Sequence, residues 1–551
     1  MPRRGVRYYR CVPPPEGEWE QDYATIARWG FELVVVPVPW ALAQGVEGRL
    51  DFSPLLRQAA IAGRHGLGVV VAPDAGSDEA AGEVVAFVRA VAVAAAPHAS
   101  VAAYDLSAFH GARLAECLRA VAEADPRRPI ISSELSPADA ATGLSVAAGG
   151  LLPHQAVDRW RAAASGRPLW VLGLPADSSM RARLQAWSSL IAGAYAVVYE
   201  AWRPELSATA GPALARPDGA PSERLRAVAA LDVLLARHPA LRGARAGAAE
   251  AAVVVVSESA EFWASGGRDE RLYADALAGA YAALGSRGAH VEFAPPAALA
   301  GYPVAYAPLA TAVSRETAEA LRRYVEGGGC LVAEAGLATC DERAVSARES
   351  PRHGLGEVFG TRALDVPEAV GDEPRPTFTG RRGPYPCYRC RQPLEAVGGS
   401  VKSVFADGAA AIVDNALGLG SARLIGTQPS LGCARTEDKR YAQVILDSLA
   451  YAKVRQRVVT TASQVCARLL EGEGGERFLV AFNQAAAPQE ARLRVSGALG
   501  RFRRALDLVS GRYLRLLNNG LRVKMPPADG VVLQLDTVPR RRRWRPGRGV
   551  T

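Results

Sequence analysis

Short apolar runs rich in β-branched residues alternate with amphipathic stretches over residues 1 to about 240. Helical patterns such as "WEQDYATIARWG" and "SPLLRQAAIAGRHG" separate these runs, which have the length and composition of strands. Eight strands that alternate with helices predict a parallel sheet covered by helices, and eight is the number that closes a (β/α)8 barrel. We therefore expect an α/β barrel over residues 1–245, with strands in "VRYYRCV", "FELVVVPVPW", "LGVVVAP", "SVAAYDL", "RPIISS", "LSVAAGG", "RPLWVLGL" and "AYAVVYEAW".

A second alternating pattern begins at "AAVVVVSES", after a Pro-rich turn and a helix. Strand and helix patterns then follow one another in "RLYADALAGAYAALGSRG", "HVEFAP", "VAYAPLA", "SRETAEALRRYVEGGG" and "CLVAEAG". This order predicts a doubly wound α/β domain over residues 246–455. The stretch 340–400, rich in Pro, Gly and Arg, is interpreted as a long insertion.

After residue 455 the apolar residues alternate with period two between tight turns, as in "RFLVAFNQAA", "QEARLRVSG" and "GVVLQLDTV". This pattern predicts a small antiparallel β domain over residues 456–538. Residues 539–551 form a basic tail that we expect to be solvated and disordered.

The net charge of +9 changes the picture little, because most of the excess lies in this tail, at Arg540, Arg541, Arg542, Arg543, Arg545 and Arg548. No basic and aromatic module accompanies the tail, so nucleic acid is not an expected partner. Eight irregularly spaced cysteines do not make a disulfide framework, and the close pair Cys387 and Cys390 has no second pair or histidine beside it to indicate zinc. With no signal-peptide core and no membrane span, we expect a cytoplasmic protein.

The order of parts resembles the β-galactosidases of glycoside hydrolase family 42. "WEQDYATIARWGFELVVVPVPWA" is similar to the family's first helix and second strand, and "GRLDFSPLLRQAAIAGRHGLGVVVAP" to its approach to strand three. "LAGYPVAYAPLATAVSRETAEALRRYVEGGGCLVAEAG" resembles its trimerisation segment most specifically. The resemblance implies a (β/α)8 TIM barrel, a flavodoxin-like domain related to class I glutamine amidotransferases, a C-terminal β domain and a homotrimer.

The resemblance also implies where catalytic carboxylates belong. The family's acid/base is a glutamate after an asparagine at the end of strand four, and "YDLSAF" places Phe109 there, with Tyr104 and Asp105 on the preceding Trp-Asp pair. The nucleophile belongs at the end of strand seven, where "RPLWVLGLPADSS" has Gly173. Because neither Phe nor Gly transfers a proton or attacks carbon, we expect a catalytically degenerate member with a carbohydrate-binding or scaffold role.

The last barrel strand keeps the family's shape in "AYAVVYEAWRPE". The resemblance implies a substrate pocket, with a small carbohydrate as its ligand, that is lined by Tyr104, Asp105, Phe109, Trp170, Gly173, Glu200, Trp202 and Arg203. The family's cysteine-rich zinc cluster is missing, since the barrel has only Cys11 and Cys117, and we expect no metal and no cofactor.

Other acids near strand ends leave an alternative open, namely an active glycoside hydrolase with relocated carboxylates. Asp105 and Glu200 are the fallback catalytic candidates, and Glu134 and Asp177 also lie near predicted strand ends. A third hypothesis is a nucleic-acid-binding or surface-binding protein that works through its Arg tail. In the second domain Cys330 begins a strand, so it does not fit the strand-to-helix elbow of an amidotransferase nucleophile.

Overall fold

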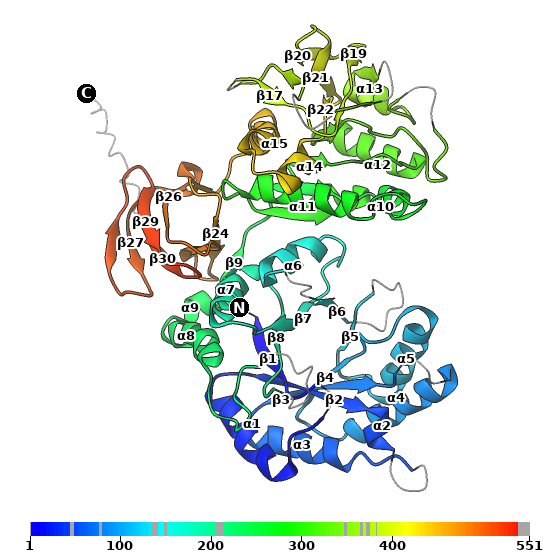
Figure 1. The fold of residues 1–551 in the computed structure, drawn as a ribbon. Helices are drawn as coiled ribbons and strands as arrows, with labels where there is room; N and C mark the ends of the chain where they lie inside the picture. Colours follow the sequence, from blue (N-terminus) through cyan, green and yellow to red (C-terminus); the bar gives the residue numbers. More distant parts are fainter. Residues whose placement is uncertain are drawn as a thin grey trace, which may run out of the picture.

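The computed structural model describes residues 2–10, 12–44, 49–76, 80–134, 142–147, 151–204, 213–346, 350–363, 367–370, 375–381 and 383–537. It has three parts: a barrel, an α/β domain and a C-terminal β domain (Figure 1). The Arg-rich tail and Cys11 lie outside the described residues. Within the described part of the chain, no helix is long and apolar enough to cross a membrane.

The barrel prediction is confirmed, because eight parallel strands close in chain order. The strands are β1 (Arg3–Arg7), β2 (Leu33–Pro39), β3 (Gly68–Asp74), β4 (Val101–Asp105), β5 (Ile130–Ser132), β6 (Gly143–Ala147), β7 (Leu169–Pro175) and β8 (Ala196–Glu200). The helices of this part are α1 (Trp19–Arg28), α2 (Trp40–Ala43), α3 (Ser53–Arg64), α4 (Ala81–Ala95), α5 (Gly111–Ala124), α6 (Pro153–Trp160), α7 (Ser179–Ala192), α8 (Glu223–Arg237) and α9 (Pro239–Gly243).

The first strand ends earlier than the sequence pattern predicts. β1 stops at Arg7, whereas the apolar run continues through Tyr8 and Tyr9. Both tyrosine rings are buried against each other and beside α1, with Tyr8 donating a hydrogen bond to Asp22. The aromatic residues that resemble a strand are therefore packing residues of the loop that follows it.

The second part is a flavodoxin-like α/β domain, as expected. Its parallel strands β10 (Ala251–Val254), β11 (Val291–Ala294), β12 (Val304–Ala307), β13 (Cys330–Glu334) and β22 (Gly420–Ile425) lie in the order β11-β10-β12-β13-β22. This is the doubly wound order in which the second strand lies outside the first. The helices are α10 (Ser257–Ala264), α11 (Arg271–Gly285), α12 (Arg315–Glu326), α13 (Leu355–Phe359), α14 (Pro429–Arg435) and α15 (Lys439–Tyr451).

Short strands from the described part of the 340–400 stretch and from the residues just after it extend the sheet or pair beside it. β21 (Ala410–Leu417), β19 (Leu394–Ala396) and β14 (Thr361–Ala363) continue the sheet in antiparallel fashion, and β20 (Ser400–Val404) pairs with β21. β15 (Glu368–Ala369) pairs with β18 (Cys390–Arg391), and β16 (Thr377–Phe378) with β17 (Tyr385–Pro386). The excursion thus caps one edge of the flavodoxin-like sheet.

The C-terminal part has two antiparallel sheets, as the period-two pattern predicts. One contains β23 (Val458–Thr460), β26 (Gln489–Val495) and β29 (Gly520–Met525). The other contains β28 (Tyr513–Arg515), β27 (Phe502–Asp507), β30 (Gly530–Thr537), β25 (Arg477–Asn483), β24 (Val465–Glu471) and β9 (Arg245–Ala246). β9 comes from the linker after the barrel, so the C-terminal sheet joins residues more than 200 positions apart in the chain.

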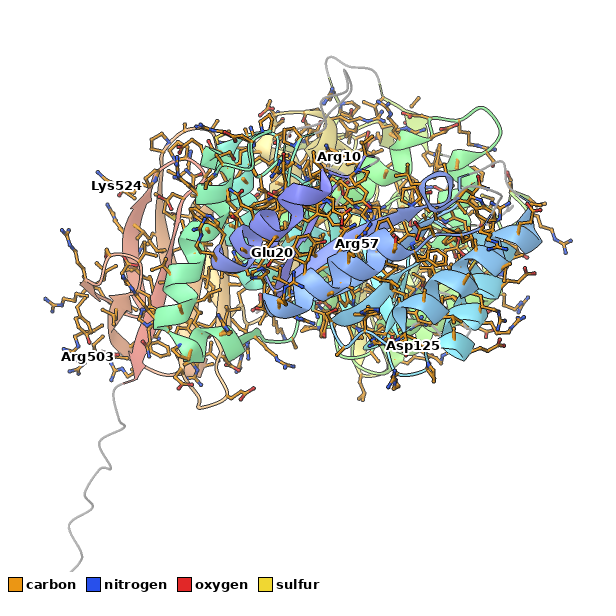
Figure 2. The ribbon with its side chains drawn as sticks, turned by 90° about the horizontal axis from the view of Figure 1, so that it is seen from below. Arg10, Glu20, Arg57, Asp125, Arg503 and Lys524 are labelled. Atoms are coloured by element: carbon orange, nitrogen blue, oxygen red, sulfur yellow. The ribbon has the colours of Figure 1, made fainter. Side chains whose placement is uncertain are left out.

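Charged side chains cover the outer faces of these elements (Figure 2). Glu20 and Arg57 lie exposed on α1 and α3, and Arg503 and Lys524 on the strands of the C-terminal domain. The apolar residues of the same elements face inward, which is the division that their amphipathic patterns predict.

A buried ion pair joins the three parts. Asp158 of α6 accepts hydrogen bonds from Tyr281 of α11, at 2.7 Å, and from Arg468 of β24. Asp158 is fully buried. Although burial acts to raise its pKa, the charge of Arg468 holds the pKa of Asp158 well below its usual range.

Helix α14 packs so closely on α11 that a glycine is required between them. A Cβ atom on Gly279 would lie 2.0 Å from the carbonyl oxygen of Ser430. The backbone N–H and the hydroxyl of Ser430 both donate to Glu334 of β13, at 2.8 and 2.7 Å. These bonds hold the start of α14 in place, so the helix cannot easily move away from a larger residue.

Gly279→Ala is therefore expected to lower the free energy of unfolding by about 1–3 kcal/mol, through overpacking against backbone. Gly285→Ala is the matched control in the same helix, because nothing lies within 4 Å of its Cβ position. That control is expected to be neutral or to stabilise by up to about 1 kcal/mol. Urea denaturation of both variants is the measurement, and equal midpoints would contradict the close packing of α11 and α14.

Candidate site at the barrel mouth

The carboxyl end of the barrel gathers charged side chains from β1, β4 and β8. Ala103 and Val198 lie in the hydrophobic cluster that fills the barrel interior. Because side chains alternate along a strand, residues two positions further on share the inward direction. Asp105 and Glu200 therefore point into the mouth from β4 and β8, and the alternation from Gly5 places Arg7 there from β1.

Arg7 links these two carboxylates. Its Nε lies 3.3 Å from Glu200 Oε2, and its Nη2 lies 3.7 Å from Asp105 Oδ2. Arg10 adds a second contact to Glu200, with 3.6 Å between Nε and Oε1. Since β4 and β8 lie four strands apart in the closed order, Arg7 connects opposite walls of the barrel.

The surroundings of Asp105 indicate a structural carboxylate. Its side chain is 2% exposed, and Oδ1 accepts a hydrogen bond from the backbone N–H of Ser107 at 3.0 Å. The other oxygen faces Arg7. The hydrogen bond from Ser107 thus fixes the turn after β4 and the ion pair with Arg7 balances the charge, whereas Glu200, at 24% exposure, remains accessible.

Gly173, at the position that the family resemblance assigns to the nucleophile, lies in a bulge of β7. The register with β8 passes from Val171 opposite Val197 to Leu174 opposite Tyr199, so β7 has an extra residue here. Gly173 has a φ of +69°, a backbone conformation that favours glycine. A Cβ atom at this position would lie 4.0 Å from Glu200 Oε2, which places the bulge beside Glu200.

Phe109, at the position assigned to the acid/base, is 5% exposed. It belongs to the hydrophobic cluster between the strands and the surrounding helices, and its N–H donates to the carbonyl oxygen of Leu106. The aromatic ring therefore packs where the resemblance implies a carboxylate.

Three residues expected to line the pocket point elsewhere, and the assignment is corrected for them. Tyr104 donates to Asp125 Oδ2 at 3.0 Å, behind β4, because it has the outward direction between the inward Ala103 and Asp105. Trp202 is fully buried in the outer cluster. The side chain of Arg203 turns to α1, where Nη2 lies 2.7 Å from Asp22 Oδ1.

The fourth correction concerns Trp170, which lies inside the barrel but at its amino end. It is the second residue of β7 and is 1% exposed. Its ring lies 4.9 Å from that of Tyr195, just before β8 begins. Trp170 therefore fills the floor of the barrel and does not form a platform at the mouth.

The remaining polar candidates have local partners. Glu134 accepts from the N–H of Gly111 at the start of α5, at 3.0 Å, and lies 3.2 Å from His110 Nδ1. Asp177 is 53% exposed beside Arg181. Among the residues that the structure describes, no group of three ligating side chains lies at the mouth.

Sequence reasoning missed Arg7 and Arg10, which organise the charges of the mouth. The alternation of inward and outward side chains along β1 could have predicted the direction of Arg7, because Arg7 follows the inward Gly5 by two residues. In the second domain, Cys330 does begin β13, and burial raises the pKa of its thiol to about 11, as in a structural cysteine.

A closed parallel barrel, a flavodoxin-like domain and a small β domain follow one another along the chain. Residues 249–455 match the family model of the β-galactosidase trimerisation domain. No curated protein matches the chain by sequence.

Solved structures similar to the whole chain have the same architecture. The β-galactosidase from Bacillus circulans sp. alkalophilus is 16% identical, with a TM-score of 0.78, over 96% of this chain and 99% of that one. A catalytic mutant of a GH42 β-galactosidase from G. stearothermophilus is 14% identical, with a TM-score of 0.77, over 97% and 98%. The enzyme from Halorubrum lacusprofundi is 19% identical, with a TM-score of 0.73, over 97% and 99%. The resemblance to family 42 is thus confirmed for the fold of the whole chain and, in residues 249–455, for the sequence.

The conformation of Gly173 in the bulge leads to a prediction about the stability of the folded protein. Gly173→Ala is expected to lower the free energy of unfolding by about 1–2 kcal/mol, because a side chain disfavours the left-handed region. Gly82→Ala, in α4 with nothing within 4 Å of its Cβ position, is the control and is expected to be neutral or stabilising. The two variants are compared by urea denaturation, and an unchanged midpoint for Gly173→Ala would argue against the strained bulge.

Proposed function

We propose that this chain is a catalytically inactive β-galactosidase-like protein that keeps the family 42 fold for carbohydrate binding and assembly. A retaining glycosidase needs two carboxylates about 5–5.5 Å apart at the barrel mouth, one as acid and one as nucleophile. The positions that the resemblance assigns to these groups hold a buried Phe109 and Gly173 in a bulge.

The link that Arg7 makes between Asp105 and Glu200 is the observation that carries the proposal. A general acid must present a proton to the leaving group, yet Asp105 Oδ1 accepts a hydrogen bond from Ser107 N–H and Oδ2 forms an ion pair with Arg7, which favours the ionised carboxylate. The two oxygens of Glu200 face Arg7 and Arg10. The carboxylates of the mouth therefore balance arginine charges.

The same groups suit a carbohydrate ligand. Sugar hydroxyls both donate and accept hydrogen bonds, and Glu200 offers acceptors beside the donors of Arg7 and Arg10. All three side chains are 22–24% exposed. A small sugar that reaches them would be bound by polar contacts at the rim and held without chemistry.

A second candidate function is an active glycosidase with relocated acids. Its supporting observation is that one guanidinium contacts both Asp105 and Glu200, which come from opposite walls of the barrel. In that case Glu200, the more exposed of the two, would be the nucleophile, and Asp105 would need to give up its contact with Ser107 to act as the acid.

The two functions differ in turnover of aryl β-galactosides. We expect the unmodified protein to be slower than an active family 42 enzyme by roughly four or more orders of magnitude, because it lacks both members of the catalytic pair. The assay compares it with Glu200→Gln, Asp105→Asn and the control Asp177→Asn, whose carboxylate is exposed beside Arg181. Robust turnover that Glu200→Gln abolishes and Asp177→Asn preserves would establish the relocated acids instead.

The match of residues 249–455 to a trimerisation domain supports assembly as a homotrimer. A closed ring of three uses a heterologous interface, in which one face of each subunit meets a different face of the next. The described cysteines are free thiols, which supports a reducing, cytoplasmic setting.

Light scattering coupled to size exclusion is expected to give three times the chain mass of 58.1 kDa at micromolar concentration. The mass should not change with reducing agent, since no disulfide is involved. A mass of one chain, independent of concentration, would remove the assembly role from the proposal.

A further inference from the structure

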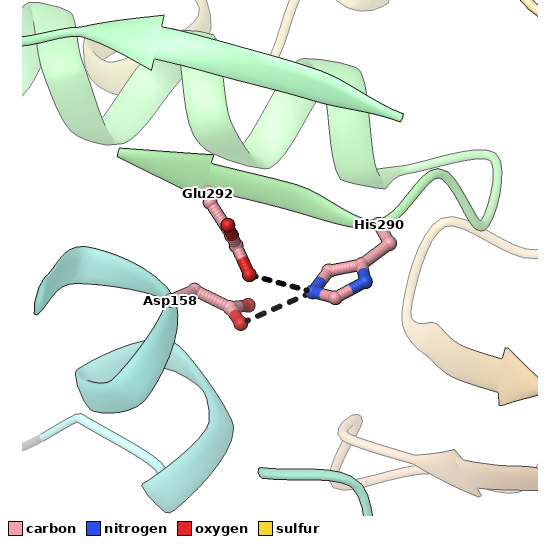
Figure 3. Close-up of side chains that lie close together, drawn as sticks. All are labelled: Asp158, His290 and Glu292. Atoms are coloured by element: carbon pink, nitrogen blue, oxygen red, sulfur yellow. Dashed lines mark ion pairs between the residues drawn. The ribbon is translucent and has the colours of Figure 1, made fainter. Parts of the chain in front are cut away.

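We propose that Asp158, His290 and Glu292 form a divalent metal site of the zinc type where the barrel meets the flavodoxin-like domain (Figure 3). Asp158 belongs to α6 of the barrel, Glu292 belongs to β11, and His290 immediately precedes that strand. The site lies at the amino end of the barrel and is independent of the function proposed for the mouth.

The separations of His290 Nε2 from the two carboxylate oxygens fit a four-coordinate ion. His290 Nε2 lies 3.6 Å from Asp158 Oδ1 and 3.5 Å from Glu292 Oε1. Ligand atoms about 2.0–2.1 Å from a tetrahedral zinc ion lie roughly 3.4 Å from one another. Charged N–H···O hydrogen bonds are shorter, at about 2.7–2.9 Å, so the spacing fits a metal better than a shared proton.

The histidine ring is oriented as in metal sites. His290 Nδ1 lies 3.1 Å from the carbonyl oxygen of Gly247, to which it donates, so the lone pair of Nε2 faces the two carboxylates. Within the described residues, neither His290 Nε2 nor the buried Asp158 Oδ1 has a hydrogen-bond partner. Lone pairs that face one another in a buried place call for a cation between them.

The other oxygens of both carboxylates are held by neighbouring residues. Tyr281 and Arg468 donate to Asp158 Oδ2, and Tyr302 donates to Glu292 Oε2 at 2.7 Å. These bonds orient the ligands in the way that outer contacts do in metal sites.

Two arginines set a limit on affinity. Arg468 pairs with Asp158, and Arg161 Nε lies 3.1 Å from Glu292 Oε1. Their charges oppose a bound cation, and Arg161 competes with it for the same oxygen. We therefore expect weaker binding than in a closed cysteine-rich zinc site.

An ion can reach the site from solvent. His290, Glu292 and Arg161 line a cavity of about 830 Å³ between the amino end of the barrel and the second domain. The cavity leaves the fourth coordination position to solvent or to an anionic ligand. A bound ion would cross-link α6 to the β11 region and so stabilise the docking of the two parts.

The test uses the full-length protein after chelator treatment, titrated with zinc chloride in a calorimeter. We expect one zinc ion per chain and a melting temperature that rises with zinc concentration. His290→Ala should lose both effects. His110→Ala is the matched control and should keep both effects. His110 also lies beside a carboxylate, that of Glu134, but it is 70% exposed and does not belong to the proposed metal site.

Two further measurements guard against a variant that fails to fold. Glu292→Gln keeps the shape of the side chain and should weaken zinc binding by at least about tenfold, since it removes a charged ligand. Cobalt(II) in place of zinc should give the strong visible absorption of a four-coordinate ion. Zinc binding that survives both His290→Ala and Glu292→Gln, six-coordinate cobalt, or no stoichiometric binding by the unmodified protein would each overturn the proposal.

Discussion

The buried carboxylate of Asp158 is the constraint on which the arrangement of the three parts depends. It belongs to the barrel, but its hydrogen-bond donors come from the flavodoxin-like domain, through Tyr281, and from the C-terminal domain, through Arg468. A buried charge without its partner costs several kcal/mol. The barrel is therefore most stable when both other parts are docked. The ion pair of Asp158 acts together with apolar packing to fix the relative positions of the three parts.

At the mouth of the barrel a buried carboxylate is also paired with an arginine, but the pair is less buried. Asp105 is nearly as buried as Asp158, but its partner Arg7 is 22% exposed, and Glu200 opposite is partly solvated. Arg7 thus holds together the ends of β4 and β8. A ligand of the kind proposed above would therefore have to compete with these ion pairs.

Periodicity in the sequence was sufficient to predict the barrel, a doubly wound α/β domain and the antiparallel C-terminal domain, because each rests on local alternation of apolar residues. It failed where partners are distant in the chain. The two residues of β9 pair with β24, and His290 meets Asp158, through contacts that no local pattern encodes. The pocket assignment carried over by resemblance failed for Tyr104 because its direction on the strand takes it away from the mouth, and for Arg203 because its guanidinium pairs with Asp22 of α1.

Gly173 occupies the position that the resemblance assigns to the nucleophile, and its backbone conformation as well as its missing side chain sets this position apart. Its left-handed backbone belongs to the bulge that brings β7 and β8 back into register, and Glu200 lies directly beside it. A glutamate placed there would strain the bulge and set a second negative charge next to Glu200. Phe109 likewise cannot become an acid without burying a carboxylate among apolar side chains. The two positions are thus built into the packing and charge balance of this barrel, so a glutamate at either of them would disturb its surroundings.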